Sequence, residues 1–155
     1  MKNENEKLNN ELLQAAESGD VTKVKELLNK GANVNAKDIE GMTALHYAAE
    51  NDYPEILKVL IENGANVHAR DMEGMTPTHW AAGNGSAKAL KVLIENGADV
   101  NARNKYKETP IHLAAEYNYP ETFKILMQNG AKMKVKNKYG LTPLDYTENK
   151  PIKFF

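Results

Sequence analysis

The chain has 155 residues, 41% hydrophobic and 26% charged, which is the usual range for a folded globular protein. Its 20 Lys and Arg against 21 Asp and Glu leave a formal net charge of -1, which argues against nucleic acid and membrane surfaces as partners. Cysteine is absent, as are an apolar leader and a membrane-length apolar run, so we expect a cytoplasmic protein, with export by a route independent of a signal peptide as the alternative.

A period of 33 residues runs along the chain. It is carried by Thr43, Thr76, Thr109 and Thr142, and by Gly31, Gly64, Gly97 and Gly130. This period predicts a single domain made of repeats, because such units stack on their neighbours to bury a shared core. The predicted units are an N-terminal cap unit 5–37, full repeats 38–70, 71–103 and 104–136, and a C-terminal cap unit 137–155.

Each full repeat predicts two short antiparallel helices. The first begins after Thr43, Thr76 or Thr109, where Thr is a favourable N-cap and Pro follows in two of the three cases. Breaks follow at 51–52, 84–85 and 118, which hold residue types that tolerate a left-handed backbone. The second helix is apolar on one face and ends at an Asn-Gly pair.

A recurring segment follows each second helix, namely Gly-Ala-Asn-Val-Asn-Ala at 31–36, with close variants at 64–69 and 97–102. With the Thr-Pro-x-His-x-Ala pattern at the same spacing, it resembles the ankyrin repeat from about Leu8 to Asp145. The resemblance implies an all-α solenoid of stacked helix-turn-helix units with β-hairpin-like fingers. It also implies that Asn35 and Asn101 match a position that is open to hydroxylation. Lys107 stands where Gly41 and Gly74 stand in other fingers, which predicts a strained or reshaped turn.

The C-terminal unit begins a last helix near Thr142, but Pro151 stops its continuation. We expect Phe154 and Phe155 to fold back over exposed core as a cap. The alternative is a tail that docks elsewhere, including on a second copy of the chain. A monomer is the expected state and self-association the alternative.

The chemistry-bearing residues favour structure over catalysis. His46, His79 and His112 recur at the repeat period, but stacked helices lie about 8–10 Å apart, too far for these side chains to share a metal ion. The resemblance implies that each bonds to Thr and to loop backbone instead. The segment 83–88 resembles a phosphate-binding loop only faintly, because no strand precedes it. We expect no catalytic residue, no metal and no cofactor, with a small enzyme or ligand carrier as the least favoured reading.

The resemblance implies a concave surface, formed by fingers and first helices, that binds proteins. Its exposed finger positions are Ile39, Glu40, Met42, Met72, Glu73, Met75, Lys105, Tyr106, Glu108, Lys138, Tyr139 and Leu141. The first two fingers place Ile or Met beside Glu and the next two carry Lys-Tyr, so the strip runs from acidic to basic. The alternative is that single apolar surface residues carry no function.

The middle repeat adds a second binding feature. Gly83 and its small neighbours predict a shallow depression at the centre of the stack, next to Trp80. Its predicted aromatic walls are Tyr47 and Tyr53 on one side and Tyr117 and Tyr119 on the other. The alternative is that Trp80 fills space left by Thr78.

The expected function is therefore binding of another protein, of unknown identity, by an adaptor or inhibitor. A self-associating structural module, and a bacterial or parasite effector acting on a host protein, are the alternatives.

Overall fold

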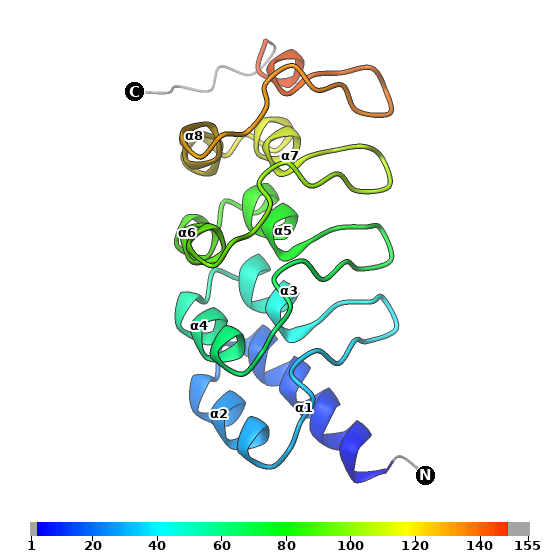
Figure 1. The fold of residues 1–155 in the computed structure, drawn as a ribbon, viewed down its shortest axis with the longest axis vertical. Coiled ribbons are helices and arrows are strands. Elements are labelled where there is room, and N and C mark those ends of the chain that lie inside the picture. The colour runs from blue at the N-terminus through cyan, green and yellow to red at the C-terminus, as the bar shows by residue number, and fades with distance from the viewer. Residues whose placement is uncertain (1–2, 149–155) are drawn as a thin grey trace.

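The computed structural model describes residues 3–148, which form a stack of helix pairs with loops projecting to one side (Figure 1). The helices are α1 (Glu4–Ser18), α2 (Val21–Asn29), α3 (Ala44–Glu50), α4 (Pro54–Glu62), α5 (Pro77–Gly83), α6 (Ala87–Glu95), α7 (Pro110–Glu116), α8 (Pro120–Gln128) and the 3-10 helix η1 (Pro143–Tyr146). No residue of this described part is in a β-strand, and the predicted all-α class is confirmed. The predicted cap at 151–155 lies outside the described residues.

The predicted helix starts are confirmed, and each has a reciprocal cap. In α3 the N-cap Thr43 accepts a hydrogen bond from the backbone of His46, while the His46 side chain accepts one from the N-cap backbone. The same reciprocal arrangement, a capping box, lies at the N-terminus of α5, α7 and η1. The first helix differs, because α1 has 15 residues against seven in α3, and its N-cap Asn3 accepts from Glu6 N–H at 2.8 Å. Capping of this kind stabilises each helix by about 1 kcal/mol.

The three repeated histidines connect each unit to the next. His46 is fully buried, its Nδ1 accepts from the Thr43 N–H at 3.1 Å, and its Nε2 donates to the Met75 carbonyl at 2.9 Å. His79 and His112 make the same two kinds of bond, each to the base of the following finger. Both ring nitrogens are therefore occupied in all three, which leaves neither as a metal ligand and confirms the structural role.

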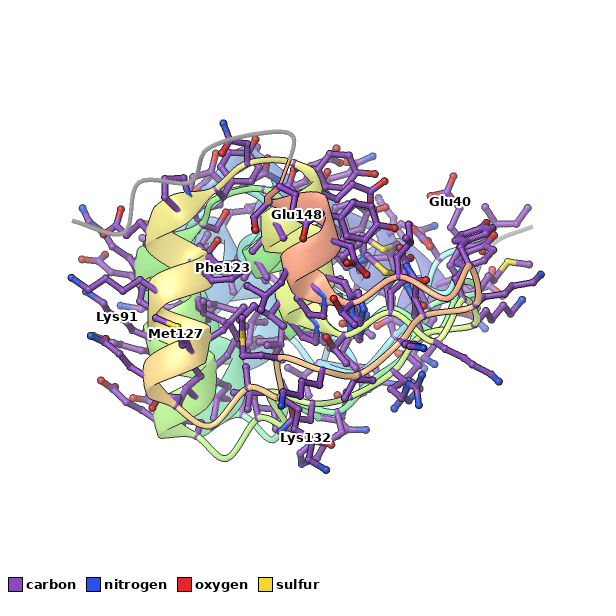
Figure 2. The ribbon with its side chains drawn as sticks, turned by 90° about the horizontal axis from the view of Figure 1, so that it is seen from above. Glu40, Lys91, Phe123, Met127, Lys132 and Glu148 are labelled. Atoms are coloured by element: carbon purple, nitrogen blue, oxygen red, sulfur yellow. The ribbon has the colours of Figure 1, made fainter. Side chains whose placement is uncertain are left out.

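The second helices form the back of the stack and close the core. Phe123 of α8 has no exposed surface and points inward, toward the first-helix layer (Figure 2). Met127 of the same helix lies on the outer side and is exposed. Leu57, Leu90 and Leu126 are also fully buried, so each second helix contributes one apolar stripe to a continuous core.

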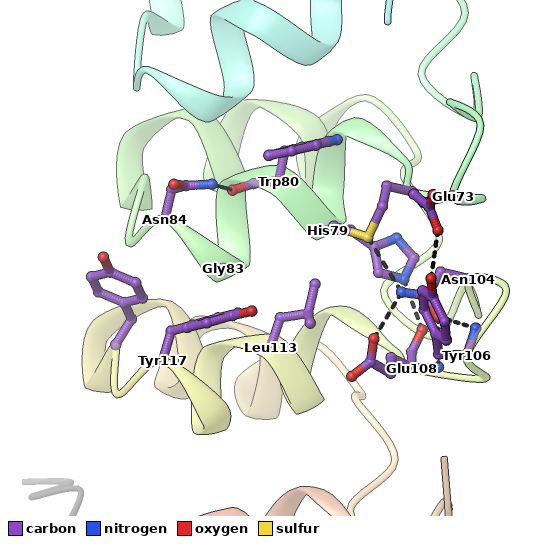
Figure 3. Close-up of a pocket in the computed structure, with 12 residues that line it drawn as sticks. Glu73, His79, Trp80, Gly83, Asn84, Asn104, Tyr106, Glu108, Leu113 and Tyr117 are labelled. Atoms are coloured by element: carbon purple, nitrogen blue, oxygen red, sulfur yellow. Dashed lines mark hydrogen bonds between the residues drawn. The ribbon is translucent and has the colours of Figure 1, made fainter. Parts of the chain in front are cut away.

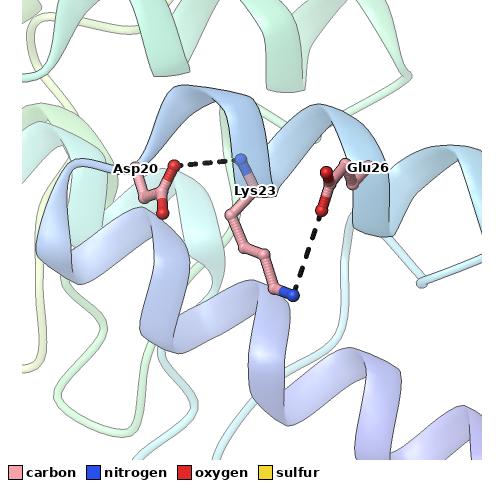
Figure 4. Close-up of polar contacts among 3 residues, drawn as sticks. All are labelled: Asp20, Lys23 and Glu26. Atoms are coloured by element: carbon pink, nitrogen blue, oxygen red, sulfur yellow. Dashed lines mark hydrogen bonds and ion pairs between the residues drawn. The ribbon is translucent and has the colours of Figure 1, made fainter.

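The surface of α2 carries an exposed ion pair, and ion pairs contribute little to the stability of this fold. Asp20 caps the helix by accepting from the Lys23 N–H at 3.0 Å, and the Lys23 ammonium lies 3.9 Å from Glu26 (Figure 4). Within residues 3–148 this is the one ion pair. An exposed pair one helical turn apart contributes about 0.3–0.5 kcal/mol, so packing and backbone hydrogen bonds dominate stability.

Two different contacts join successive units at the turn between the helices of a pair. In the first kind, which we call the glycine–tyrosine joint, a tyrosine ring covers a left-handed glycine of the preceding unit. Tyr53 covers Gly19 and Tyr119 covers Gly85, so closely that a Cβ on either glycine would lie 2.8 or 2.5 Å from the ring. Only glycine fits under the ring.

The second kind, the aspartate–serine joint, links the repeats in between. Asp52 has φ 58°, the left-handed conformation predicted for this break, and its Oδ1 accepts from the Ala89 N–H at 2.9 Å. Ser86 stands where the other joints have tyrosine, and its hydroxyl donates to the Glu50 carbonyl at 2.9 Å. A polar joint therefore alternates with two aromatic ones.

An amide bridge on the outer loops ties two of the units together. The Asn35 side chain donates to the Gly64 carbonyl at 3.1 Å and accepts from the Asn66 N–H at 2.8 Å. Asn101 makes the equivalent pair of bonds with the next unit. Because both ends of each amide are already bonded, these residues stabilise the stack, and their hydroxylation stays a prediction.

The projecting loops, which we call fingers, comprise residues 38–42, 71–75, 104–108 and 137–141. In the first, Asp38 N–H donates to the Met42 carbonyl at 3.0 Å, and Asp38 Oδ1 accepts from the N–H groups of Glu40 and Met42. The other three repeat this arrangement around Asp71, Asn104 and Asn137. Each finger is thus a tight turn closed by one side chain, without strand pairing along its length.

The third finger contains the predicted backbone strain. Lys107 has φ 57°, where Gly41, Gly74 and Gly140 occupy the same left-handed region in the other fingers. A residue with a Cβ costs about 1 kcal/mol or more there. We therefore expect Lys107→Gly to raise the free energy of unfolding by about 1 kcal/mol, measured by urea denaturation. Lys105→Gly, in the same finger but outside the left-handed region, is the control and should give no gain; an equal gain would contradict the strain.

Candidate protein-binding surface

The first helices and the fingers together form one face of the molecule (Figure 1). One backbone hydrogen bond joins each pair of neighbouring fingers, from Met72 N–H to the Glu40 carbonyl, from Lys105 N–H to the Glu73 carbonyl, and from Lys138 N–H to the Tyr106 carbonyl. The first two measure 3.0 Å and the third 2.8 Å. This ladder holds the fingers in register, so their side chains form a preorganised surface.

Most predicted binding residues lie on this face with accessible side chains. The exposed ones are Ile39, Glu40, Met72, Glu73, Lys105, Tyr117, Lys138 and Tyr139. Met75, Trp80, Gly83, Tyr106 and Glu108 are half-buried. Ile39 is 92% exposed and Tyr117 58% exposed, so both are available to a partner.

Met42 is not an exposed finger residue, and that prediction is wrong. Only 4% of its surface is accessible. Its N–H and carbonyl both bond back to Asp38, which places it at the base of the finger beside the buried N-cap Thr43. The tip of the finger is formed by the residues before it, and these alone reach solvent.

A hollow of about 540 Å³ lies between α5 and α7, under the second and third fingers (Figure 3). It is lined by Glu73, Met75, His79, Trp80, Gly83, Asn84, Asn104, Tyr106, Glu108, Leu113, Tyr117 and Tyr119. In Figure 3 the Trp80 ring lies across from Leu113 and Tyr117. The carboxylates of Glu73 and Glu108 lie at the finger side of the hollow. The predicted depression is present, with aromatic walls and an acidic end.

Two substitutions within the repeat pattern open this hollow. The helix position facing each finger is Tyr47, Trp80, Leu113 and Tyr146 in successive units. Three of these are aromatic, and Leu113 is smaller. Gly83 then stands where the neighbouring repeats have glutamate, and a Cβ added to it would lie 3.3 Å from Leu113 Cβ. The small pair lets α5 and α7 approach closely while leaving space in front of them.

Trp80 makes the same kind of hydrogen bond as the aromatic residue at the equivalent position of the preceding repeat. Its Nε1 donates to Asp71 at 2.9 Å, just as the Tyr47 hydroxyl donates to Asp38. Trp80 therefore does not fill space beside Thr78, since residues two apart on a helix face different directions and Thr78 is itself buried. Within residues 3–148 the Thr78 hydroxyl is the one buried side-chain polar atom without a hydrogen-bond partner.

Two predicted walls lie elsewhere. Tyr53 covers Gly19 in its joint, and Tyr47 lines a separate hollow at the α1 end together with Leu13 and Glu17. The depression is therefore bounded by Trp80 on one side and by Tyr117 and Tyr119 on the other. On the first side, the wall comes from the second full repeat, and not from the first as predicted.

Carboxylates on this face raise the pKa values of neighbouring groups. The pKa of Glu50 is raised by burial and by the neighbouring Glu17 and Glu40. The pKa of Tyr117 is raised by Glu116, by burial and by Glu108. In both cases nearby carboxylates make a further negative charge unfavourable.

A basic column is formed by the residues that directly precede the first three fingers. Lys37, Arg70 and Arg103 each donate to the backbone carbonyl of the residue 33 positions on, at 2.9, 2.7 and 2.5 Å. The last of these carbonyls belongs to Lys136, which continues the column.

The segment 83–88 forms a turn between helices and has no phosphate-binding geometry. The N–H groups of Gly85, Ser86 and Ala87 donate to nearby carbonyls within the turn, so they are not directed at a ligand. Across residues 3–148, no group of three or more His, Cys, Asp or Glu is placed to hold a metal ion. Over the same stretch, no helix combines the length and the apolar character that crossing a membrane requires.

Sequence reasoning missed the hollow's other contributors. Leu113, Asn84 and Asn104 were not among the predicted binding residues, although all three line it. The repeat period carried the signal for Leu113, because it alone breaks the aromatic series at its position. The repeat period also singles out Asn104, because the first two fingers have an aspartate at the same position.

Comparison with known proteins agrees with this architecture. The family model described as ankyrin repeats (3 copies) matches residues 12–104 and 66–137. Two putative ankyrin repeat proteins of Rickettsia felis are each 42% identical over 53 residues, or 34% of this chain, which cover 84% of one relative and 80% of the other. The periodic capping boxes, the histidine links between units and this match over most of the sequence together make the chain a member of the ankyrin repeat family.

Proposed function

We propose that the chain binds a partner protein on the face made by its fingers and first helices, as an adaptor or inhibitor, with the central hollow as the anchoring point. Ankyrin repeats are generally protein-protein interaction modules. The observation that supports this placement is the hollow of about 540 Å³ with Trp80 and Tyr117 in its wall. Exposed aromatic residues around a concavity are the usual anchors of protein interfaces.

The neighbouring surface extends the proposed interface along the stack. Ile39 and Met72 are exposed apolar tips on one side, and Tyr139 is exposed on the other. Because backbone hydrogen bonds hold the fingers in register, a partner meets a surface that needs little reordering. The absence of cysteine agrees with a reducing compartment, and we place this interaction in the cytoplasm.

Affinity capture from a lysate of the source cell tests this function. We expect Gly83→Arg, which fills the hollow, to reduce capture of the main partner by about tenfold or more relative to the unchanged chain. Gln128→Arg is the matched control, since it adds the same charge at the exposed end of α8, away from this face.

Gly83→Arg also crowds Leu113, so a second variant keeps the test interpretable. Tyr117→Ala removes an exposed ring without touching the core and should likewise weaken capture. Equal capture by both variants and by the control would place the binding surface elsewhere.

A further inference from the structure

The hollow has two chemically different ends. Trp80, Leu113 and Tyr117 form walls of rings and alkyl groups along the helices, whereas Glu73 and Glu108 enter from the fingers (Figure 3). An occupant that satisfies both ends needs a long apolar stem and a polar head. The hollow has a volume of about 540 Å³, which is that of a small-molecule pocket. It therefore has room for such a side chain and for part of the residues next to it in the partner.

The two carboxylates are bonded only to neutral groups. Glu73 accepts from the Tyr106 hydroxyl at 2.8 Å, and Glu108 accepts from the Asn104 amide at 3.1 Å. Neither is in an ion pair, since the one ion pair of residues 3–148 lies on α2. Both negative charges are therefore available to a cation of a partner.

The surroundings reinforce this negative charge. The pKa of Tyr106 is raised, first by its hydrogen bond to Glu73 and then by that carboxylate's charge, and the pKa of Tyr117 is raised by Glu116 and Glu108. The Lys138 ammonium lies 5.9 Å from the centre of the Tyr106 ring, within the range of a cation–π contact.

These observations discriminate among side chains. An anionic side chain is repelled by the two carboxylates. An apolar group covers the carboxylates without pairing them, which leaves them desolvated at a cost. A lysine ammonium pairs with them but is compact and strongly hydrated. An arginine guanidinium stacks on aromatic faces and binds a carboxylate through two parallel hydrogen bonds.

We propose that the hollow receives an arginine side chain from a basic segment of the partner protein, stacked between Trp80 and Tyr117 with its guanidinium on Glu73 and Glu108. This inference rests on the proposed function, because it names the occupant of the same site. The lining of the hollow agrees with it, since it contains Glu73 and Glu108 but no lysine or arginine that would repel the guanidinium.

Trp80 is the one tryptophan of the sequence, so its fluorescence reports on the hollow directly. The probes are three capped pentapeptides, Gly-Gly-X-Gly-Gly, in which X is arginine, lysine or citrulline, the last a neutral isostere of arginine. We expect the arginine peptide to shift the Trp80 emission with a Kd about tenfold below that of the citrulline peptide, with lysine between them. Raising the salt concentration should reduce this difference.

Two double variants make the test specific. Glu73→Gln with Glu108→Gln should abolish the preference for arginine over citrulline. Glu62→Gln with Glu121→Gln changes the charge equally at exposed positions on the second helices and should leave the preference intact. Equal affinities for the arginine and citrulline peptides, or no response to arginine up to about 10 mM, would overturn the proposal.

The lysate experiment separates this failure from that of the proposed function. If Gly83→Arg abolishes capture while the peptides show no preference, the hollow binds a partner through another side chain. If the peptides discriminate but capture is unchanged by both Gly83→Arg and Tyr117→Ala, the preference of the hollow for arginine stands, and the placement of the main partner on this surface is overturned.

Discussion

Acidification from about pH 7.5 to about pH 4 is expected to lower the free energy of unfolding by about 3 kcal/mol through His79 alone. Burial lowers the pKa of His79 from 6.5 to about 4, against the opposing effect of its hydrogen bond to the Glu108 carbonyl. Arg70 and His46 lower it further and Asp71 raises it. The bond geometry agrees, because Nδ1 already accepts from a backbone N–H and has no room for a proton.

The direction of the effect follows from proton binding. Below pH 6.5 the unfolded chain takes up a proton on this imidazole, whereas the folded chain does not until the pH approaches about 4. Stability is therefore fully present above pH 6.5 and falls as the pH decreases through that window. His46 and His112 add to the fall, since burial lowers the pKa of each.

Urea denaturation of the unchanged chain and of His79→Gln across this range isolates the effect. The variant should be less stable at neutral pH, because it loses the link to the next finger. The difference between the two proteins should then shrink on acidification, since only the unchanged chain titrates at this position. Two parallel stability curves would show that His79 does not resist protonation.

Gly85→Asp is expected to lower the free energy of unfolding by about 2–5 kcal/mol. The position has φ 70°, which costs a residue with a Cβ about 1–2 kcal/mol, and the Cβ would lie 2.5 Å from the Tyr119 ring. Displacing that ring adds a further 1–3 kcal/mol, about the cost of overpacking. The substitution puts an aspartate into a glycine–tyrosine joint.

Combining Gly85→Asp with Tyr119→Ser is the informative control, because it rebuilds the aspartate–serine joint seen at Asp52 and Ser86. The double variant should be more stable than Gly85→Asp alone, with an interaction energy of about 1 kcal/mol or more in the double-mutant cycle. Additive losses would mean that the two residues of a joint are independent.

The helical frame was predictable because its signals are local. A Thr N-cap with His three residues later both starts a helix and defines the link to the next unit, and it recurs every 33 residues. The conformation of the fingers was harder to predict from the sequence. Whether a finger side chain points to solvent depends on the backbone bonds of the turn, and these bury Met42, a residue that the resemblance to the ankyrin repeat placed on the surface.

The hollow was predicted in part. The small size of Gly83 and the neighbouring Trp80 indicated a central depression, since a missing side chain leaves space wherever its neighbours stay in place. Its true walls depend on which helix positions face each other across a gap, and that is a property of stacking. Tyr53 was assigned to the hollow for this reason, while in the structure its ring covers Gly19.

The alternation of the two joints gives the array a second, longer period. A single added copy of 71–103 would set Gly85 against a second Ser86, a glycine without its ring. A copy of the two repeats 38–103 would instead set Gly85 against a second Tyr53 and repeat the Asp52–Ser86 contact, so every joint stays matched. The unit that can be added to this chain without a mismatch at these joints is therefore a pair of repeats.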